Sequence, residues 1–312
     1  MRILFMGTPD FAACSLEALV RAGADICGVI TREDKPQGRK MVLTPPPVKV
    51  TAQKYDLPVY QPERLKDGAI QDLLDTLSPE LIVVVAYGKI LPKYILDSPK
   101  YGCINLHGSL LPKYRGASPI QSAVLAGERV TGVSTMYLAE GMDEGDVIES
   151  ASTEIGEYET SGELFDRLME LGAQLLCHTV RLIEEGHAPR VPQDHAEASY
   201  CTMLRKEAAR IDFSRPAQEV INLIRGMNPW PVAFTSLEGR TLKVWRALRG
   251  GVCAGRAPGT VLGLVKGAGI EIACGDGRSI VVTELQPENG RRMAAEAYYI
   301  GHRALAGAVL GA

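Results

Sequence analysis

The 312-residue sequence has no apolar run of the roughly 18 residues that a membrane-spanning helix needs. Its first residues, MRILFMG, lead directly into a predicted strand and lack the longer apolar region and cleavage site of a signal peptide. The seven cysteines are scattered and include no C-x-x-C pair, which argues against a structural zinc site and a disulfide framework. We therefore expect a cytoplasmic protein whose cysteines are mostly small buried apolar side chains.

A dinucleotide-binding fingerprint is also missing. The predicted strand 2–6 and helix 11–22, which Asp10 is expected to cap, are joined by a turn that reads GTPD rather than G-x-G-x-x-G. Further along, the nearly all-apolar run 81–86 is typical of a central parallel strand, and residues 161–185 have the apolar spacing of a long helix. This alternation predicts an α/β domain with a Rossmann-like, mostly parallel sheet.

The C-terminal part has a different pattern. Five short runs of strand length are separated by tight turns, which predicts a small OB-like β-barrel. A helix is expected to close it over residues 293–305. At this length two domains are expected. We predict a catalytic domain over residues 1–188, a linker over 189–209 and an OB-like domain over 210–312.

Charge is distributed unevenly between these parts. Residues 1–199 hold 19 Lys/Arg and 28 Asp/Glu, a net charge of −9, whereas residues 200–312 hold 15 and 9, a net charge of +6. A basic C-terminal part indicates a polyanionic partner. Ordinary surface asymmetry is the alternative interpretation.

One short strand carries two candidate catalytic side chains. Asn105 and His107 lie two positions apart on the predicted strand 103–107, so both side chains leave the same face. Gly108 then allows the chain to turn, which places the pair at the carboxyl end of a strand, where open α/β sheets bind ligands. The alternative is a hydrogen-bonded pair in the core.

Asp143 is the third candidate and lies in a Gly-bracketed loop after the predicted strand 132–138. A carboxylate near His107 would favour the imidazolium, and an Asn amide and an imidazolium together stabilise a tetrahedral oxyanion. The pattern does not obviously require a Ser or Cys nucleophile, so it is compatible with direct attack by an incoming amine. The four other histidines, at 178, 187, 195 and 302, form no ligand-like constellation, and we assign them structural roles.

Two motifs, NLHGSLLP at 105–112 and MDEGDVI at 142–148, resemble those of the folate-dependent formyltransferases. Further segments resemble, more narrowly, the methionyl-tRNA formyltransferase family. They are FMGTPDF at 5–11, VVAYG at 84–88, SLLPKYRG at 109–116 and NPWP at 228–231. The resemblance covers the whole chain.

The resemblance implies transfer of a formyl group from 10-formyltetrahydrofolate to the amine of methionyl initiator tRNA, for translation initiation. It implies that Asn105, His107 and Asp143 are catalytic and that no metal is used. The protein is expected to be a monomer. The folate-contacting segment would be Ser109, Leu110, Leu111 and Pro112, with Tyr87 lining the pocket.

A basic loop over residues 32–49 includes Lys35, Arg39, Lys40 and Lys49. The resemblance implies that this loop enters the acceptor arm of the tRNA and that Arg39 is the recognition arginine. The family commonly has Gly-Arg-Gly here, whereas Lys40 follows Arg39 in this chain. Lys206, in the basic end of the linker, is expected to face nucleic acid, with a solvated surface lysine as the alternative.

Two rival functions stay open at this point. The first is a folate formyltransferase that acts on a small amine, such as a sugar nucleotide or glycinamide ribonucleotide. The basic loop and the C-terminal barrel favour tRNA instead. The second is an RNA-binding module that has lost catalysis, and the presence of Asn105, His107 and Asp143 argues against it.

Overall fold

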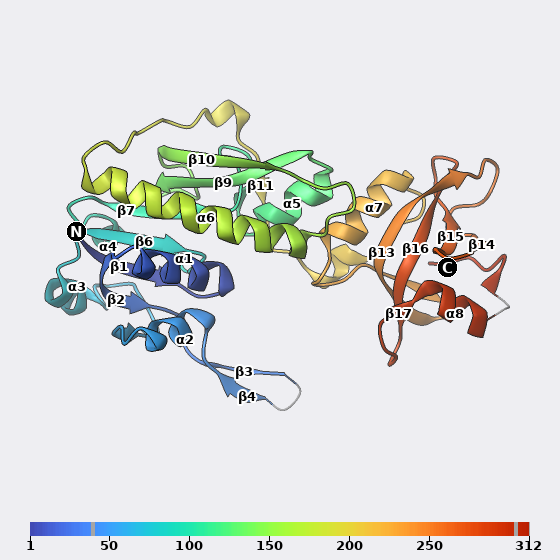
Figure 1. Cartoon of the computed structure of the whole chain (residues 1–312), viewed down its shortest axis with the longest axis horizontal. Coiled ribbons are helices and arrows are strands. Elements are labelled where there is room, and N and C mark those ends of the chain that lie inside the picture. The colour runs from blue at the N-terminus through green and yellow to red at the C-terminus, as the bar shows by residue number, and fades with distance from the viewer. Residues whose placement is uncertain (39–40, 303–304, 312) are drawn as a thin grey trace. The chain divides into compact units, whose positions relative to one another are not determined.

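The computed structural model describes residues 1–38, 41–302 and 305–311 (Figure 1). The chain divides into two compact units, each assembled from segments that are separate in the sequence. The first comprises Met1–Gly116, Gly132–Thr153 and Asp166–Tyr200, and the second comprises Ala117–Thr131, Glu154–Phe165 and Cys201–Ala312. The domain boundaries expected at 188 and 209 stay a prediction. None of the helices formed by the described residues has the length and apolar character needed to cross a bilayer.

A seven-stranded sheet forms the centre of the first unit, in the order β10-β9-β7-β6-β1-β2-β5. Its strands are β1 (Arg2–Gly7), β2 (Asp25–Ile30), β5 (Val59–Tyr60), β6 (Leu81–Val85), β7 (Cys103–His107), β9 (Val130–Tyr137) and β10 (Val147–Glu154). The run from β5 through β2, β1 and β6 to β7 is parallel, and β9 is antiparallel to β7. The predicted Rossmann-like, mostly parallel sheet is confirmed.

Helices cover this sheet on both faces, which explains why all five residues of β6 are buried (Figure 1). On one face lie α1 (Asp10–Arg21) and α6 (Ser161–Glu184), and a Cβ added to Gly172 of α6 would lie 3.0 Å from Leu106 of β7. On the other face, α3 (Gln71–Leu77) and α4 (Lys93–Leu96) share a core with β1 and β6. The short helix α2 (Pro47–Lys54) packs against α1.

The turn between β1 and α1 leaves no room for a side chain at Gly7. A Cβ there would lie 2.6 Å from the Cβ of Ala12 and 2.8 Å from the carbonyl oxygen of Val85. The expectation that Asp10 caps α1 is wrong, because Asp10 is the first helical residue and Pro9 occupies the cap without a side-chain hydrogen bond. Asp10 instead places a negative charge in the first turn, where it interacts favourably with the positive end of the helix dipole.

The strand order reverses direction at the centre of this sheet. The chain builds β1, β2 and β5 to one side and then returns to add β6 and β7 on the other side of β1. Ligands bind outside the carboxyl ends of the strands at such a switch point. The residues at those ends are Gly7, Val85 and His107.

An antiparallel sheet forms the core of the second unit, in the order β12-β13-β16-β15-β14, with β17 beside β16. Its strands are β12 (Phe234–Leu237), β13 (Arg240–Val252), β14 (Val261–Val265), β15 (Gly269–Ala273), β16 (Arg278–Pro287) and β17 (Met293–Ala294). The unit also holds α5 (Pro119–Ala126) and α7 (Ala217–Gly226), which pack against each other. The predicted small β domain is confirmed.

The helix expected over residues 293–305 begins later than predicted. Met293 and Ala294 form β17, because they pair with Leu285 and Glu284 of β16, and α8 runs from Ala295 to Gly301. The predicted 32–49 loop includes regular structure. It contains a hairpin of β3 (Lys35–Gln37) and β4 (Val42–Thr44). Four short elements complete the chain: β8 (Arg115–Gly116), β11 (Tyr200–Cys201), η1 (His195–Glu197) and η2 (Lys206–Ala209).

Candidate active site

Asn105 and His107 lie on one face of β7, as their spacing predicts, with 9% and 5% of their surface exposed. In the antiparallel register Asn105 lies opposite Met136 of β9 and His107 lies opposite Ser134. No hydrogen bond joins the carboxamide of Asn105 to any other residue that the structure describes. Its amide is therefore available to a ligand.

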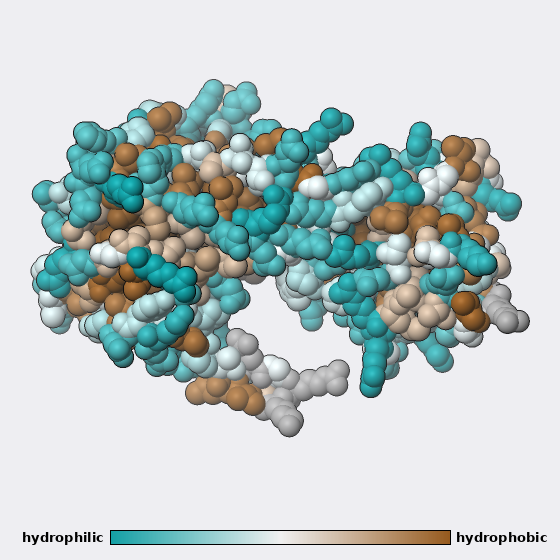
Figure 2. Space-filling model, in the orientation of Figure 1, coloured by the Kyte–Doolittle hydropathy of each residue, from teal (hydrophilic) through white to brown (hydrophobic). Residues whose placement is uncertain are grey.

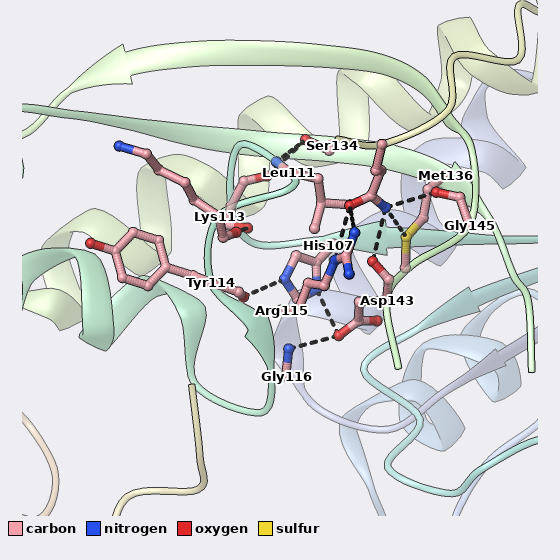
Figure 3. A network of polar contacts seen from close by, with 12 residues as sticks. His107, Leu111, Lys113, Tyr114, Arg115, Gly116, Ser134, Met136, Asp143 and Gly145 are labelled. Atoms are coloured by element: carbon pink, nitrogen blue, oxygen red, sulfur yellow. Dashed lines mark hydrogen bonds and ion pairs between the residues drawn. The ribbon is translucent and has the colours of Figure 1, made fainter. Parts of the chain in front are cut away.

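The imidazole of His107 is oriented by a backbone carbonyl. Its Nε2 lies 2.9 Å from the carbonyl oxygen of Tyr114, and its Nδ1 lies 3.7 Å from Oδ2 of Asp143 (Figure 3). Because a carbonyl oxygen only accepts hydrogen bonds, Nε2 carries a hydrogen. Nδ1 is therefore the ring nitrogen that faces the carboxylate.

Asp143 lies in the loop 138–146 between β9 and β10, and it has a positive φ of 52°. Its Oδ2 accepts a 2.8 Å hydrogen bond from the backbone N–H of Gly116 (Figure 3). The loop also requires a glycine at position 145, since a Cβ there would lie 1.9 Å from the carbonyl oxygen of Tyr137. The fold thus brings Asn105, His107 and Asp143, from two separate segments, to one end of the sheet.

The predicted folate-contacting segment turns back on itself. Ser109 is buried, and its hydroxyl donates a 2.6 Å hydrogen bond to the carbonyl oxygen of Lys113. Ser134 of β9 holds the segment from the other side. Its hydroxyl donates to the Ser109 carbonyl at 2.8 Å and accepts from the backbone N–H of Leu111 at 3.2 Å. Leu110, Leu111 and Pro112 are half-buried. Their role in binding folate stays a prediction.

Tyr87 follows β6 and is 2% exposed, within the apolar core that α3 and α4 share with the sheet. Its hydroxyl is buried without a hydrogen-bond partner among the described residues. This burial raises the pKa of Tyr87 to about 12. Its predicted place in the folate pocket is likewise untested.

The predicted tRNA-binding residues are spread along the chain. Lys35 is exposed on β3, Lys206 is exposed in η2, and Arg39 and Lys40 lie outside the described residues. Lys49, which belongs to the predicted basic loop, is bonded to neighbouring side chains. Its ammonium donates to both carboxylate oxygens of Asp34 at 2.8 Å and to Oε1 of Gln61 at 2.9 Å.

Lys49 is therefore neutralised by a local partner. Hydrogen bonds from Gln61 and Lys49 lower the pKa of the Asp34 carboxyl. Besides Lys35, the described exposed residues of the hairpin include large apolar side chains. Met41, Val42 and Leu43 are 67%, 60% and 64% exposed, and Figure 2 shows hydrophobic surface over this hairpin.

The sequence prediction missed residues in the expected linker that complete the site. Gln193 donates hydrogen bonds to the carbonyl oxygens of Asp143 and Gly145, at 2.9 and 2.7 Å. Its acceptor oxygen binds the buried guanidinium of Arg115, which lies within the recognised 109–116 motif but had no role assigned to it. A single glutamine between Pro192 and Asp194 gives no periodic signal in the sequence.

A hollow of about 470 Å³ adjoins the Asp143 loop. The lining residues are Tyr137, Leu138, Ala139, Glu144, Gly145, Asp146, Arg190 and His195. Arg190 lies over the ring of Tyr137, with its guanidinium carbon 3.6 Å from the ring centroid. Nowhere among the residues that the structure describes do three or more His, Cys, Asp or Glu side chains gather so that they could hold a metal ion.

The chain matches two domain families along most of its length. Residues 1–180 match the formyl transferase family, and residues 203–303 match the formyl transferase C-terminal domain. A solved N-formyltransferase from Helicobacter canadensis, in complex with folinic acid and dTDP-3-aminofucose, has a similar fold. The TM-score is 0.65 at 17% identity, over 90% of this chain and 98% of that one.

Similarity to curated proteins is much higher. The chain is 47% identical to a methionyl-tRNA formyltransferase from Acetivibrio thermocellus, over 100% of both proteins. It is 49% identical to the methionyl-tRNA formyltransferase of Pelotomaculum thermopropionicum, over 100% of this chain and 99% of the relative. The chain therefore belongs to the formyl transferase family, and its full-length likeness places it among the methionyl-tRNA formyltransferases.

Proposed function

We propose that this protein transfers the formyl group of 10-formyltetrahydrofolate to the amine of methionyl initiator tRNA. Relatives of 42–49% identity over nearly the whole chain carry the name of this activity. The observation that carries the proposal is local. The carboxylate of Asp143 lies 3.7 Å from Nδ1 of His107, and Asn105, on the same face of β7 as His107, makes no side-chain hydrogen bond to any described residue. His107 of this triad ends β7, which lies next to β6 and one strand from the switch point between β6 and β1, at the sheet edge where α/β sheets bind ligands.

In the proposed reaction the neutral amine attacks the formyl carbon and forms a tetrahedral oxyanion. The amide of Asn105 donates a hydrogen bond to that oxygen, and protonated His107 adds positive charge nearby. The bond from carbon to the folate nitrogen then breaks and that nitrogen takes a proton from His107. The attacking nitrogen gives one proton back to His107, which regenerates the imidazolium. Nδ1 is the ring position for this transfer, because the hydrogen on Nε2 is held by Tyr114.

Asp143 stabilises the protonated ring through its charge at 3.7 Å. The folate itself is proposed to lie against the segment from Ser109 to Pro112, with Tyr87 behind it. These residues follow β7 and β6, whose carboxyl ends flank the triad.

For the tRNA we propose the β3–β4 hairpin with Lys35, Arg39 and Lys40, and Lys206 as a contact further along the chain. Exposed Lys35 supplies charge, and Met41, Val42 and Leu43 supply exposed apolar surface next to it. An exposed apolar patch beside basic groups is typical of an interaction surface. We further propose a cytoplasmic monomer.

The direct test is formylation by the purified protein. Methionyl initiator tRNA, 10-formyltetrahydrofolate and the protein should give formylmethionyl-tRNA. An aminosugar nucleotide in place of the tRNA should give no product. Saturable binding of the tRNA that weakens with salt should accompany the activity. Formylation of the sugar but not of the tRNA would favour the small-amine alternative. No formylation of either acceptor would contradict the enzyme assignment.

A further inference from the structure

Gln193 bonds to the loop that holds Asp143. Figure 3 draws the polar contacts around Asp143. Its side chain is buried, with 8% of the residue exposed. The amide nitrogen donates to the carbonyl oxygen of Asp143 at 2.9 Å and to that of Gly145 at 2.7 Å. The nitrogen also approaches the sulfur of Met136 on β9 at 3.9 Å, but its two short hydrogen bonds both go to the loop that carries Asp143.

Arg115 determines which way this carboxamide points. The Oε1 of Gln193 lies 3.1 Å from Nε and 2.8 Å from Nη2 of Arg115. A guanidinium only donates hydrogen bonds, so the oxygen must face Arg115 and the amide nitrogen must face the two carbonyls. Arg115 is fully buried, and its Nη1 also lies 3.3 Å from Nδ1 of His195 and 3.2 Å from the hydroxyl of Tyr200. A reversed amide would place a donor against a donor.

The backbone of the same segment is attached to the hairpin that carries the loop. Val191 and Val147 exchange two hydrogen bonds of 2.9 and 3.0 Å at the start of β10. Arg190 stacks on Tyr137 at the end of β9 and approaches Asp146 to 3.9 Å. Residues 190–193 thus form a strap across the loop, and Gln193 is the strap residue that reaches Asp143.

The loop needs such support, because Asp143 has a φ of 52°. The left-handed region is unfavourable for a residue that carries a Cβ. The two bonds from Gln193 hold the backbone on either side of Glu144 in place. The carboxylate of Asp143 can then meet the Gly116 N–H at 2.8 Å and Nδ1 of His107 at 3.7 Å.

We propose that Gln193 is a positioning residue for formyl transfer, which, oriented by Arg115, holds the Asp143 carboxylate beside His107. It touches neither substrate nor the reacting atoms. The expected effect on kcat rests on the proposed function. The expected effect on the position of Asp143 rests only on contacts within the first unit.

Two substitutions separate the contacts of this side chain. Gln193→Glu keeps the acceptor for Arg115 but removes both donors to the loop, whereas Gln193→Met removes all of them. Misplacing a catalytic group by about 1 Å can cost on the order of 10² in rate, so we expect kcat to fall by up to that factor in both variants. The KM for charged tRNA should change less than about twofold, because binding is not involved.

The matched control is Asp194→Ala. Asp194 follows directly after the strap, and the hydrogen bond that its carboxylate makes among the described residues is with the backbone N–H of Ala196 in η1. This variant should keep the wild-type kcat. A Gln193→Glu variant with wild-type kcat, while the wild type formylates tRNA, would overturn the inference and leave the proposed function intact.

A double-mutant cycle tells positioning from general destabilisation. If Gln193 acts through Asp143, Gln193→Met should lower kcat by less than about threefold when Asp143 is already alanine. Equal losses in the two backgrounds would mean that Gln193 has only a structural role, which contradicts the inference.

A last measurement does not need activity. The N–H of Gly116 is bonded to the Asp143 carboxylate, so its hydrogen exchange reports whether that carboxylate is in place. We expect faster exchange at Gly116 in Gln193→Met and unchanged exchange in Asp194→Ala. Unchanged exchange at Gly116 in Gln193→Met would refute the proposal that Gln193 holds the Asp143 carboxylate in place. This outcome can be read even if the wild type formylates neither acceptor, so it is independent of the proposed function.

Discussion

Two projecting segments of the first unit are held in opposite ways. The Asp143 loop, residues 138–146, is bonded to β7 through Leu138, to Gly116 through Asp143, and to the strap through Gln193. The backbone hydrogen bonds made by the described residues of the β3–β4 hairpin stay within the hairpin. Side chains at its base, Lys49, Asp34 and Gln61, tie it to the body.

This difference matches what the two segments are proposed to do. A carboxylate that stabilises a protonated imidazole must stay within a few ångströms of it, so its loop is fixed from several sides. A hairpin that meets a large partner keeps its exposed surface free. The same unit therefore combines a rigid chemical site with an element attached only at its base.

The strongest test of the rigid site is His107→Ala. It removes both the proton donor and the charge next to the oxyanion, and loss of one such group typically costs about 10²–10³ in kcat. Steady-state formylation of charged tRNA measures the loss, and tRNA binding should stay unchanged. A rate equal to the wild type would remove the proposed mechanism.

A second test disturbs the loop without touching its polar side chains. In Gly145→Ala the new Cβ would lie 1.9 Å from the Tyr137 carbonyl oxygen, so the loop must move. We expect a lower kcat and a loss of about 1–3 kcal/mol in the free energy of unfolding, as for other overpacked sites.

Gly301→Ala is the control for that substitution, because no atom of the described residues lies within 4 Å of a Cβ at Gly301. Urea denaturation of both variants, followed by circular dichroism, gives the comparison. If the two alanine variants had the same free energy of unfolding and Gly145→Ala kept full activity, the Asp143 loop would be able to accommodate the new Cβ. Its contacts would then hold it less firmly than we infer.

The hairpin is tested at its base. Lys49→Met breaks the contacts with Asp34 and Gln61, which should loosen the hairpin and raise the KM for charged tRNA. A partly exposed ion pair contributes up to about 1 kcal/mol, so we expect no more than about a fivefold change. The KM for the formyl donor should not change.

Lys54→Met provides the matched control on the same helix, since Lys54 pairs with Glu17 and is 58% exposed. It should leave both KM values unchanged. A rise in the KM for the formyl donor in Lys49→Met would show that the hairpin base belongs to the folate pocket, and the contrast between the two segments would fail.

The smallest effect is expected at Tyr87, whose hydroxyl is buried without a partner among the described residues. Tyr87→Phe should leave stability near pH 7 unchanged or slightly higher, because no hydrogen bond is lost. Burial raises the pKa of Tyr87 to about 12, above the value of about 10 in an unfolded chain. The wild type should therefore lose stability as the pH rises from about 10 to about 12, because only its unfolded state releases the proton there.

Denaturation at several pH values measures this difference, and the phenylalanine variant should show a weaker dependence. The KM for the formyl donor in Tyr87→Phe also tests the predicted pocket role. A large increase would place the hydroxyl in contact with folate after all.

Local sequence patterns were enough to predict much of this fold. The apolar run of β6 indicated a central strand, and the two-residue period of a strand placed Asn105 and His107 on one face. Short runs between turns likewise predicted the antiparallel strands of the second unit. The ends of the elements were predicted less well. Met293 and Ala294 were predicted to be helical, but they pair with β16 as a strand.

By itself the sequence determined which elements form and which chemical groups the site holds, because hydrophobic periods and turn residues act over a few positions. Only the tertiary structure decided that Asp143 faces Nδ1 of His107 and that Lys49 is neutralised by Asp34. It also turned residues of an expected linker into the support of the site, with Gln193 bonded to Arg115 across 78 positions. Such contacts depend on how distant backbones pack, and no local pattern records that.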